Sequence, residues 1–253
     1  MSADNIRELD YEEVSSFLVD WIKKKVSEAG KSGGVVGLSG GLDSTVTGCL
    51  LKKAFPENSL GVIMPCKSDP ADSEYALLAA DTAGIERVKV ELDDIFNDLL
   101  FRLKKVEPGK DKVAEGNIKP RLRMTALYFL AARRDALVVG TDNWSELTTG
   151  YFTKHGDGGI DIAPLGRLLK TEVRELARHL ELPERIIERP PSAGLWEGQT
   201  DEDELGMTYE EIDRYILTGE ADPKVAESVE KLKRSSRHKI EPPPVPPRED
   251  IVE

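Results

Sequence analysis

Residues 35–46 read VVGLSGGLDSTV, an apolar run that leads through a glycine pair into a polar helix start. The run 35–38 predicts a buried strand, and Ser44 is suited to cap a helix over 44–54. Glycines between a strand and a helix let backbone N–H groups approach an anion, and the helix N-terminus adds a favourable dipole. Taken alone, a Gly-Gly pair more often marks a tight turn before a capped helix. The whole stretch departs from both common phosphate-binding patterns, Gly-Lys-Ser/Thr and G-x-G-x-x-G.

Apolar runs alternate with helical patterns on the C-terminal side of this stretch. The runs cover 60–64, 88–92 and 137–140, and the helical patterns cover about 71–83, 93–105 and 119–134. This alternation predicts an α/β fold, a doubly wound parallel sheet flanked by helices on both faces. Such sheets bind ligands at the carboxyl ends of their strands, near the point where the strand order reverses. The loops after residues 38, 64 and 140 are therefore the expected location of the chemistry.

The remaining segments frame this sheet. Apolar residues at helical spacing predict an amphipathic helix over 11–29. Residues 150–170 form a glycine-rich polar segment that leads into a helix over 171–180, and 189–208 form a second long loop of the kind that serves as a lid or binding loop. Residues 241–253 form a proline-rich tail that we expect to lie extended along the surface. We expect residues 1–253 to form a single domain with its core at about 10–240.

Composition restricts the class of protein. The chain has 35 basic and 47 acidic residues, a formal charge of −12, which argues against a nucleic-acid-binding surface. Its two cysteines, Cys49 and Cys66, cannot supply a disulfide framework. No apolar run approaches the length of a membrane span, and the first ten residues lack a signal-peptide core. We therefore expect a soluble, cytoplasmic protein that does not bind membranes.

Residues Ser39-Gly40-Gly41-Leu42-Asp43-Ser44 resemble the SGGxDS loop of the ATP pyrophosphatases, which cleave ATP to AMP and pyrophosphate. The resemblance implies the adenine nucleotide alpha hydrolase-like fold, with ATP bound by Gly37, Leu38 and this loop. An aspartate inside a phosphate-binding loop would repel its ligand unless a cation intervened, so Asp43 is suited to bind Mg²⁺. Several families share this loop, which therefore indicates the chemistry and not the substrate.

Four further segments resemble the ammonia-dependent NAD synthetases in order and spacing. They are 116–124 (GNIKPRLRM), 140–146 (GTDNWSE), 151–161 (YFTKHGDGGID) and the loop 190–206. The resemblance covers about residues 10–240. It implies a C–N ligase that amidates nicotinic acid adenine dinucleotide with ammonia through an adenylated intermediate, releasing AMP and pyrophosphate. This reaction is the last step of NAD biosynthesis, with ATP as co-substrate and Mg²⁺ as cofactor.

The resemblance also implies roles for individual residues. Thr141, Lys170 and Ser192 contact ATP, with Thr200 a weaker candidate, and Glu146 is the second Mg²⁺ ligand beside Asp43. The residues that contact the dinucleotide are Arg121, Lys154, Asp161, His238 and Lys239. Asp161 and Lys170 are the catalytic candidates, with Asp161 receiving a proton from the ammonia. Without the resemblance, Arg121 and Arg123 could each form a structural ion pair, or one could face a ligand and the other the solvent. Residues 231–239 would be interpreted as a solvated helix face.

Partners and competing functions follow from the same comparison. Free ammonia is the expected nitrogen donor, although a separate glutaminase remains an alternative, and the resemblance implies a homodimer. A GMP-synthetase-like or tRNA-thiolating enzyme is the alternative within the superfamily. Thiolation normally requires catalytic cysteines and a basic RNA-binding surface. The alternative from a different class of protein is a nucleotide-binding regulatory module that lacks catalysis. The presence of Asp43, Glu146 and Lys170 argues against it.

Overall fold

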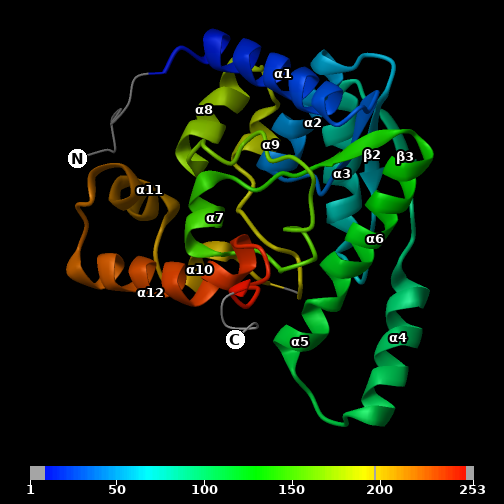
Figure 1. Ribbon diagram of the computed structural model, residues 1–253, viewed down its shortest axis with the longest axis vertical. Coiled ribbons are helices and arrows are strands. Elements are labelled where there is room, and N and C mark those ends of the chain that lie inside the picture. The colour runs from blue at the N-terminus through cyan, green and yellow to red at the C-terminus, as the bar shows by residue number, and fades with distance from the viewer. Residues whose placement is uncertain (1–8, 197, 249–253) are drawn as a thin grey trace.

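A four-stranded parallel sheet in the order β3-β2-β1-β4 forms the centre of the computed structural model, which describes residues 9–196 and 198–248 (Figure 1). The strands are β1 (Gly33–Gly37), β2 (Ser59–Ile63), β3 (Glu86–Lys89) and β4 (Ala136–Val139). Val35 of β1 pairs with Leu60 of β2 on one side and with Val138 of β4 on the other. The strand order reverses between β1 and β4, so the predicted doubly wound parallel sheet is confirmed.

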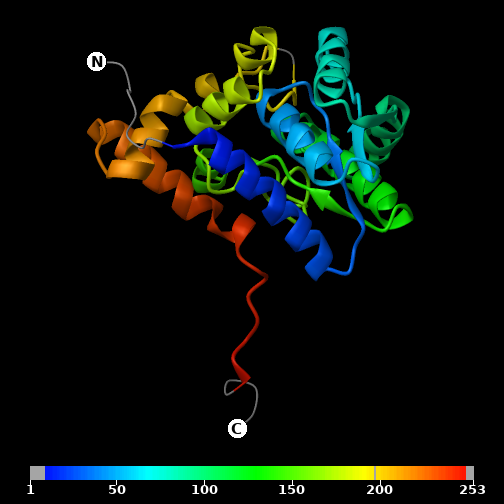
Figure 2. The same ribbon diagram turned by 90° about the horizontal axis from the view of Figure 1, so that it is seen from above.

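Twelve helices surround the sheet in the described residues. They are α1 (Tyr11–Glu28), α2 (Leu42–Ala54), α3 (Pro70–Ala83), α4 (Asp93–Val106), α5 (Lys112–Gly116), α6 (Ile118–Arg133), α7 (Trp144–Thr149), α8 (Lys170–His179), α9 (Glu184–Ile187), α10 (Asp201–Leu205), α11 (Tyr209–Thr218) and α12 (Pro223–Ile240). Helices α1, α2, α3 and α8 cover one face, and α4 and α6 cover the other (Figures 1 and 2). Val35 and Val36 belong to different clusters because successive side chains of a strand point to opposite faces.

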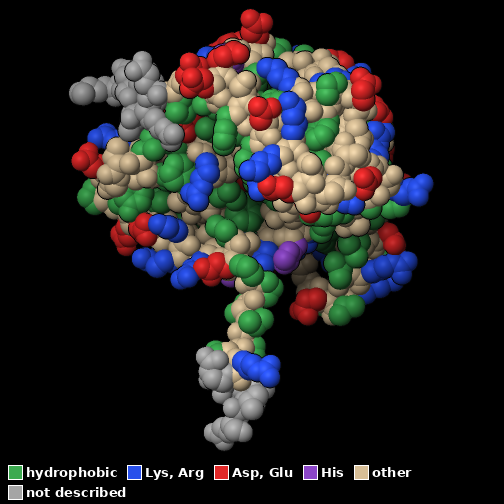
Figure 3. Space-filling view, turned by 45° about the horizontal axis from the view of Figure 1, so that its top comes forward, with side chains coloured by type: hydrophobic (Ala, Val, Ile, Leu, Met, Phe, Trp, Pro, Cys, Tyr) green, Lys and Arg blue, Asp and Glu red, His purple; other side chains and the backbone are tan. Residues whose placement is uncertain are grey.

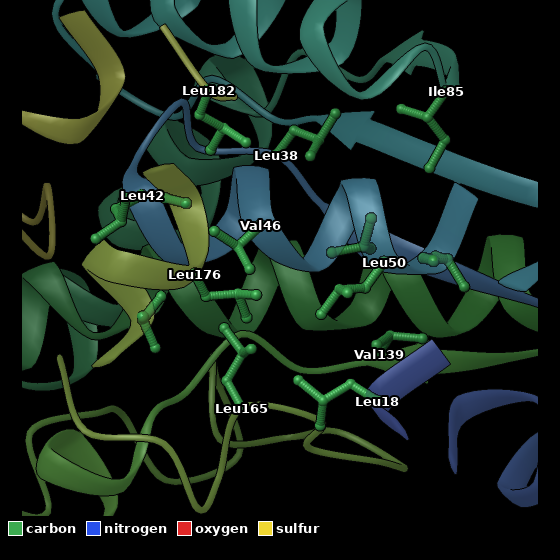
Figure 4. Packing of buried hydrophobic residues seen from close by; sticks show 14 of the residues in the cluster. Leu18, Leu38, Leu42, Val46, Leu50, Ile85, Val139, Leu165, Leu176 and Leu182 are labelled. Carbon is green, nitrogen blue, oxygen red and sulfur yellow. The ribbon is translucent and has the colours of Figure 1, made fainter. Parts of the chain in front are cut away.

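Helix α2 is the centre of the larger core cluster. Its Val46 and Leu50 lie between Leu38 and Ile85 on one side and Leu165, Leu176 and Val139 on the other (Figure 4). Both α2 residues are fully buried. This packing fixes the N-terminus of α2, and with it the loop 38–44, at the carboxyl end of β1.

The element boundaries differ from the sequence expectations in three places. Helix α2 begins at Leu42, two residues before the predicted start, and its N-cap residue is Gly41. Ser44 therefore does not cap the helix, because its hydroxyl lies inside the first turn and donates to the Gly41 carbonyl at 3.0 Å. The loop 189–208 contains the short helix α10, and β3 ends at Lys89 rather than at residue 92.

The C-terminal part of the described chain packs beside α7 and α8. Helices α11 and α12 form a small separate cluster around Tyr209, Ile212 and Val229. Beyond α12, residues 242–247 adopt no helix or strand, and they extend away from the body rather than along its surface (Figure 2). None of the helices in the described ranges has the length and apolar character required to cross a membrane.

Candidate active site

A cavity of about 990 Å³ lies at the carboxyl ends of β1, β2 and β4. Its walls come from the loop after β1, the segment 63–73 after β2, residues 138–142 at the end of β4, and parts of the segments 150–160 and 187–199. This location is the one expected for a doubly wound sheet, where the strand order reverses. The volume is at the upper end of the range of about 300–1,000 Å³ that small-molecule sites occupy.

Most predicted nucleotide-binding and metal-binding residues line this cavity. They are Gly37, Leu38, Ser39, Gly41, Leu42, Asp43, Ser44, Thr141, Glu146, Lys170 and Ser192, together with Lys239 from the predicted dinucleotide group. Gly40 and Thr200 are not part of the lining, and Thr200 instead caps α10. The other predicted dinucleotide contacts, Arg121, Lys154, Asp161 and His238, also lie outside the lining.

Hydrogen bonds within the loop 39–44 give it a fixed shape. The Ser39 hydroxyl accepts from Gly41 N at 3.2 Å and lies 3.1 Å from the Ser44 hydroxyl, which in turn accepts from Ser39 N at 3.3 Å. Gly40 has a left-handed backbone (φ +76°) and touches the backbone of α3. The first N–H groups of α2 have no carbonyl partners within the helix and are available to an anion in the cavity.

Lys170 joins two carboxylates from different helices at one wall of the cavity. Its Nζ lies 2.5 Å from Oδ2 of Asp43 (α2) and 3.2 Å from Oε1 of Glu146 (α7), and the side chains are 5%, 14% and 14% exposed respectively. Asn143 holds both acids in place, since its Nδ2 donates to Asp43 at 3.0 Å and its Oδ1 accepts from Glu146 N at 3.0 Å. The sequence expectation that Asp43 and Glu146 form one site is consistent with this geometry.

Burial and charge act in opposite directions in this cluster. Burial raises the pKa of Glu146 to about 7, although the charge of Lys170 opposes the shift. Burial alone would lower the pKa of Lys170, but the charges of Asp43 and Glu146 outweigh it and raise that pKa. The ammonium therefore stays charged, and it neutralises a pair of acids that would otherwise repel each other.

Two further carboxylates, the buried Asp142 and the exposed Asp157, line the cavity and were not singled out from the sequence. Asp142 is 5% exposed, and its Oδ2 has no hydrogen-bond partner among the described residues. Burial, followed by the charges of Asp157, Glu146 and Asp43, raises the pKa of Asp142 well above its usual range. Asp157 accepts from Thr153 N at 2.9 Å. Asp142 directly follows a strand end, a position that could have identified it as a candidate.

The remaining predicted dinucleotide contacts gather beside the cavity, around the segment 150–154 and the end of α12. The Lys154 Nζ donates to the His238 carbonyl at 2.5 Å, and the Arg121 Nε donates to the Lys154 carbonyl at 3.4 Å. The Lys239 Nζ donates to the carbonyls of Gly150 and Phe152 at 2.7 and 2.8 Å. Residues more than 80 positions apart in the sequence are thus brought together.

Comparison with known proteins assigns the chain to a family. The sequence model described as NAD synthase matches residues 14–243. The chain belongs to the NAD synthase family. It is 52% identical to the NH(3)-dependent NAD(+) synthetase of Carboxydothermus hydrogenoformans over 94% of this chain and 98% of that protein. The resemblance expected from the motifs is confirmed.

Solved structures agree with this assignment. NMN synthetase from Francisella tularensis is similar with a TM-score of 0.89 and 36% identity, covering 94% of this chain and 99% of that one. The NH3-dependent NAD synthetase from Campylobacter jejuni is similar with a TM-score of 0.77 and 30% identity, covering 95% and 100%. The NAD synthase fold therefore extends over nearly the whole chain.

In this NAD synthase family member, the two arginines of the segment 116–124 have separate environments. Arg123 lines the cavity, where its Nε donates to the Met64 carbonyl at 3.1 Å and its Nη2 to the Ser68 hydroxyl at 3.4 Å. Arg121 is exposed on another side of α6. Spacing alone indicated two faces but not which arginine faces the cavity, because that depends on how α6 packs on the sheet.

Asp161 is also placed differently from the predicted nucleotide-binding residues of this NAD synthase family member. Its Oδ1 accepts from the Tyr128 hydroxyl at 3.0 Å and its Oδ2 accepts from Val138 N at 2.8 Å. Together with Tyr128 it lies outside the cavity lining. Its role as proton acceptor therefore remains a prediction.

Gly150 is expected to be essential for holding the end of α12 against the cavity. It ends α7 with φ +67°, and a Cβ at this position would overlap Cβ and Oγ of Ser236 in α12. Gly150→Ala should lower the free energy of unfolding by about 1–2 kcal/mol for the left-handed backbone and by about 1–3 kcal/mol more for the overlap. Urea denaturation measures both losses.

The matched control for Gly150 is Gly219, which ends α11 with φ +72° and has no described neighbour within 4 Å of a Cβ. Gly219→Ala should show the backbone cost alone. Equal losses for the two variants would contradict a steric role for Gly150. Because the Lys239 ammonium donates to the Gly150 carbonyl and both residues line the cavity, Gly150→Ala alone should also weaken ligand binding in the cavity.

Proposed function

We propose that this NAD synthase family member amidates nicotinic acid adenine dinucleotide with ammonia, at the expense of ATP, to give NAD, AMP and pyrophosphate. The observation that carries the proposal is the cluster of Asp43, Glu146 and Lys170 beside an N–H-lined loop in one cavity. Such a cluster suits the charge of a departing pyrophosphate. The reaction agrees with the name of the relative that is 52% identical over almost its whole length.

The chemistry requires activation because a carboxylate oxygen is a poor leaving group for attack by ammonia. The carboxylate oxygen of the acid bonds to the α-phosphorus of ATP, and the bond from that phosphorus to the bridging β-phosphate oxygen breaks. Ammonia then bonds to the acyl carbon, AMP leaves with the acyl oxygen, and one proton is released. In this scheme the loop 39–44 and the first N–H groups of α2 hold phosphate oxygens, and the Lys170 ammonium neutralises the pyrophosphate.

We infer that Asp43 and Glu146 bind Mg²⁺ together with the nucleotide. The donor set fits, because Mg²⁺ in nucleotide sites is bound by one or two carboxylates plus phosphate oxygens. The structure supports the fit, since the Lys170 ammonium already demonstrates that a cation can occupy the space between these carboxylates. When bound, the ion supplies positive charge to the phosphate oxygens.

The ammonia must lose a proton, and two aspartates are candidates to receive it. We propose Asp161 on the basis of the motif, while the partnerless Oδ2 of Asp142 in the cavity wall makes Asp142 the competitor. Asp161→Asn should slow NAD formation by about 10²–10⁴-fold, with the pyrophosphate burst retained. Rapid-quench measurement of both products tests this. If only Asp142→Asn separates the two steps, Asp142 receives the proton.

A mononucleotide substrate is the second candidate. The structure with the TM-score of 0.89 is described as NMN synthetase, whereas the Campylobacter jejuni NAD synthetase scores 0.77. In addition, four of the predicted dinucleotide contacts lie outside the cavity lining. Amidation of nicotinic acid mononucleotide would use the same ATP site and would not need those residues.

Coupled measurement of pyrophosphate and amide product tests both candidates. The enzyme is given ATP and Mg²⁺ with either the dinucleotide or the mononucleotide acid, and either ammonium chloride or glutamine. We expect NAD from the dinucleotide with ammonium. A higher kcat/KM for the mononucleotide would favour the second candidate, and turnover with glutamine alone would contradict ammonia as the donor. No turnover with either acid would contradict both candidates.

We propose that the protein works in the cytoplasm as a homodimer and does not bind nucleic acid or membranes. On the face shown in Figure 3, basic and acidic side chains are intermingled and do not form one basic area. Both cysteines are free thiols, which suits a reducing compartment. Large apolar side chains are exposed on the neighbouring helices α4 and α6, among them Phe101 (60%) and Phe129 (67%).

The apolar surface on α4 and α6 leads to a prediction about assembly. Light scattering should give twice the chain mass for the wild type and the chain mass for Phe129→Asp, because an unpaired charge at an interface is strongly unfavourable. Phe17 on α1 is equally exposed at 65% and provides the control. Phe17→Asp should remain dimeric. A wild type of single-chain mass would contradict the dimer.

A further inference from the structure

The N-terminus of α8 is stabilised by residues from other helices. This helix begins at Lys170, and its N-cap residue Leu169 has no side-chain hydrogen bond to offer. The N–H of Lys170 donates to the Ser145 hydroxyl of α7 at 3.0 Å, and the N–H of Thr171 donates to Oδ2 of Asp213 in α11 at 2.9 Å. Within α8, Glu172 accepts from Leu169 N at 2.9 Å, but the N–H groups of Lys170 and Thr171 are held by residues of α7 and α11.

Asp213 is the residue that connects these contacts. It is 3% exposed. Its Oδ1 accepts a hydrogen bond from the Ser145 hydroxyl, and its Oδ2 accepts from both the N–H and the hydroxyl of Thr171, the latter at 2.8 Å. A carboxylate at a helix N-terminus is also favoured by the helix dipole. One buried side chain thus links the starts of α7 and α8.

The linked residues are direct neighbours of the proposed catalytic groups. Ser145 precedes Glu146 in α7, and Thr171 follows Lys170 in α8. The 3.2 Å distance from the Lys170 Nζ to the Glu146 Oε1 therefore depends on how these two helix starts are held together. Asp213 itself is not part of the cavity lining and touches neither carboxylate of the cluster among its described contacts.

We propose that Asp213 is a positioning residue that, through Ser145 and Thr171, holds the start of α8 against α7 and so aims the Lys170 ammonium at the phosphates of ATP. The inference rests on the proposed function, because it assumes that Lys170 acts on the nucleotide. Asp213 contributes no group to the reaction. Its sequence position, 43 residues after Lys170, gives no indication of this role.

Asp213→Asn is the first test, since asparagine has the same shape but cannot accept all three hydrogen bonds. We expect kcat to fall by between about 10-fold and about 100-fold, because a displacement of about 1 Å at a reacting group can cost 10²-fold. Asp222→Asn is the control, since Asp222 caps α12 by accepting from Lys224 N at 2.9 Å, away from the cavity. That variant should leave kcat unchanged and lose little stability, because asparagine caps a helix about as well as aspartate.

A double-mutant cycle with Lys170→Met separates positioning from general destabilisation. If Asp213 acts through Lys170, Asp213→Asn should change kcat by less than about threefold in the Lys170→Met background, because coupled residues give non-additive effects. An equal fold-change in kcat for Asp213→Asn in both backgrounds would overturn the proposal. An unchanged kcat for Asp213→Asn in the wild-type background would overturn it as well.

Calorimetry can measure ATP binding without any acid substrate for the wild type, the two single variants and the double variant of this cycle. This measurement is independent of the amidation reaction. Asp213→Asn should weaken ATP binding in the wild-type background and not in the Lys170→Met background. Additive losses would contradict the role of Asp213. Failure of an ATP-binding wild type to amidate either acid would contradict only the proposed function.

Discussion

Lys170→Met is expected to lower kcat by about 10²–10³-fold, the usual effect of removing one preorganised group that stabilises developing charge. The ammonium lies 2.5 Å from Asp43 and 3.2 Å from Glu146 at the wall of the nucleotide cavity, and methionine fills a similar volume without the charge. Steady-state release of pyrophosphate measures the effect. Lys119 provides a control, since it is also buried (6% exposed) but donates only to the Lys67 carbonyl. Lys119→Met should reduce kcat far less.

The same substitution should also destabilise the fold. Without the lysine, two buried carboxylates face each other uncompensated, and loss of one partner from a buried ion pair costs about 3–5 kcal/mol. Because burial already raises the pKa of Glu146 to about 7, the variant can relieve the repulsion by binding a proton. The loss in urea denaturation should therefore be larger at pH 8 than at pH 5. A loss that does not vary with pH would contradict this account.

Gly40→Ala is expected to disrupt the loop 39–44 more than a methyl group added at any other position of that loop. The residue has φ +76°, and an added Cβ would lie 2.5 Å from the backbone nitrogen of Ala76 in α3. Neither the loop nor α3 can move without disturbing the core around α2. We expect a loss of about 2–5 kcal/mol of unfolding free energy, the sum of backbone strain and overpacking. Binding of ATP should weaken at least tenfold, as calorimetry can measure.

Gly84 is the matched control for Gly40. It ends α3 with φ +61°, but an added Cβ would have no described neighbour within 4 Å. Gly84→Ala should therefore lose only the backbone cost of about 1–2 kcal/mol and keep the affinity for ATP. If Gly84→Ala and Gly40→Ala reduced stability and ATP binding equally, contact with α3 would not be the reason for glycine at position 40.

The sheet and its loops were predictable because their signals are local. The apolar run around Val35 and Val36, the glycine pair and the helix that follows are contiguous, and each of the other strands is also followed within a few residues by a helix. The end of β3 was not predictable, because Val90 N and Leu92 N still donate to the Ile63 and Pro65 carbonyls after the regular ladder has ended. For helix α12, only the basic stretch 231–239 was interpreted as a helix face, and the start of the helix at Pro223 was not assigned.

The candidate site was predictable only where a motif marks it. Asp43, Glu146 and Lys170 each follow a recognisable segment, and the structure brings them together. Asp213 was missed because its importance comes from hydrogen bonds to Ser145 and Thr171, which are distant in sequence. The choice between Arg121 and Arg123 was open for a related reason, since helix periodicity separates their faces without saying which face packs on the sheet.

The lysine between Asp43 and Glu146 means that the protein carries its own counter-ion for this pair of acids. In proteins with a structural metal, the free energy of metal binding is part of the free energy of folding, and chelators unfold them. Here an ammonium group of the chain itself neutralises the acids, so we expect a chelating buffer to leave the fold intact. If Mg²⁺ binds together with the nucleotide, as we propose, its addition would set the start of the reaction.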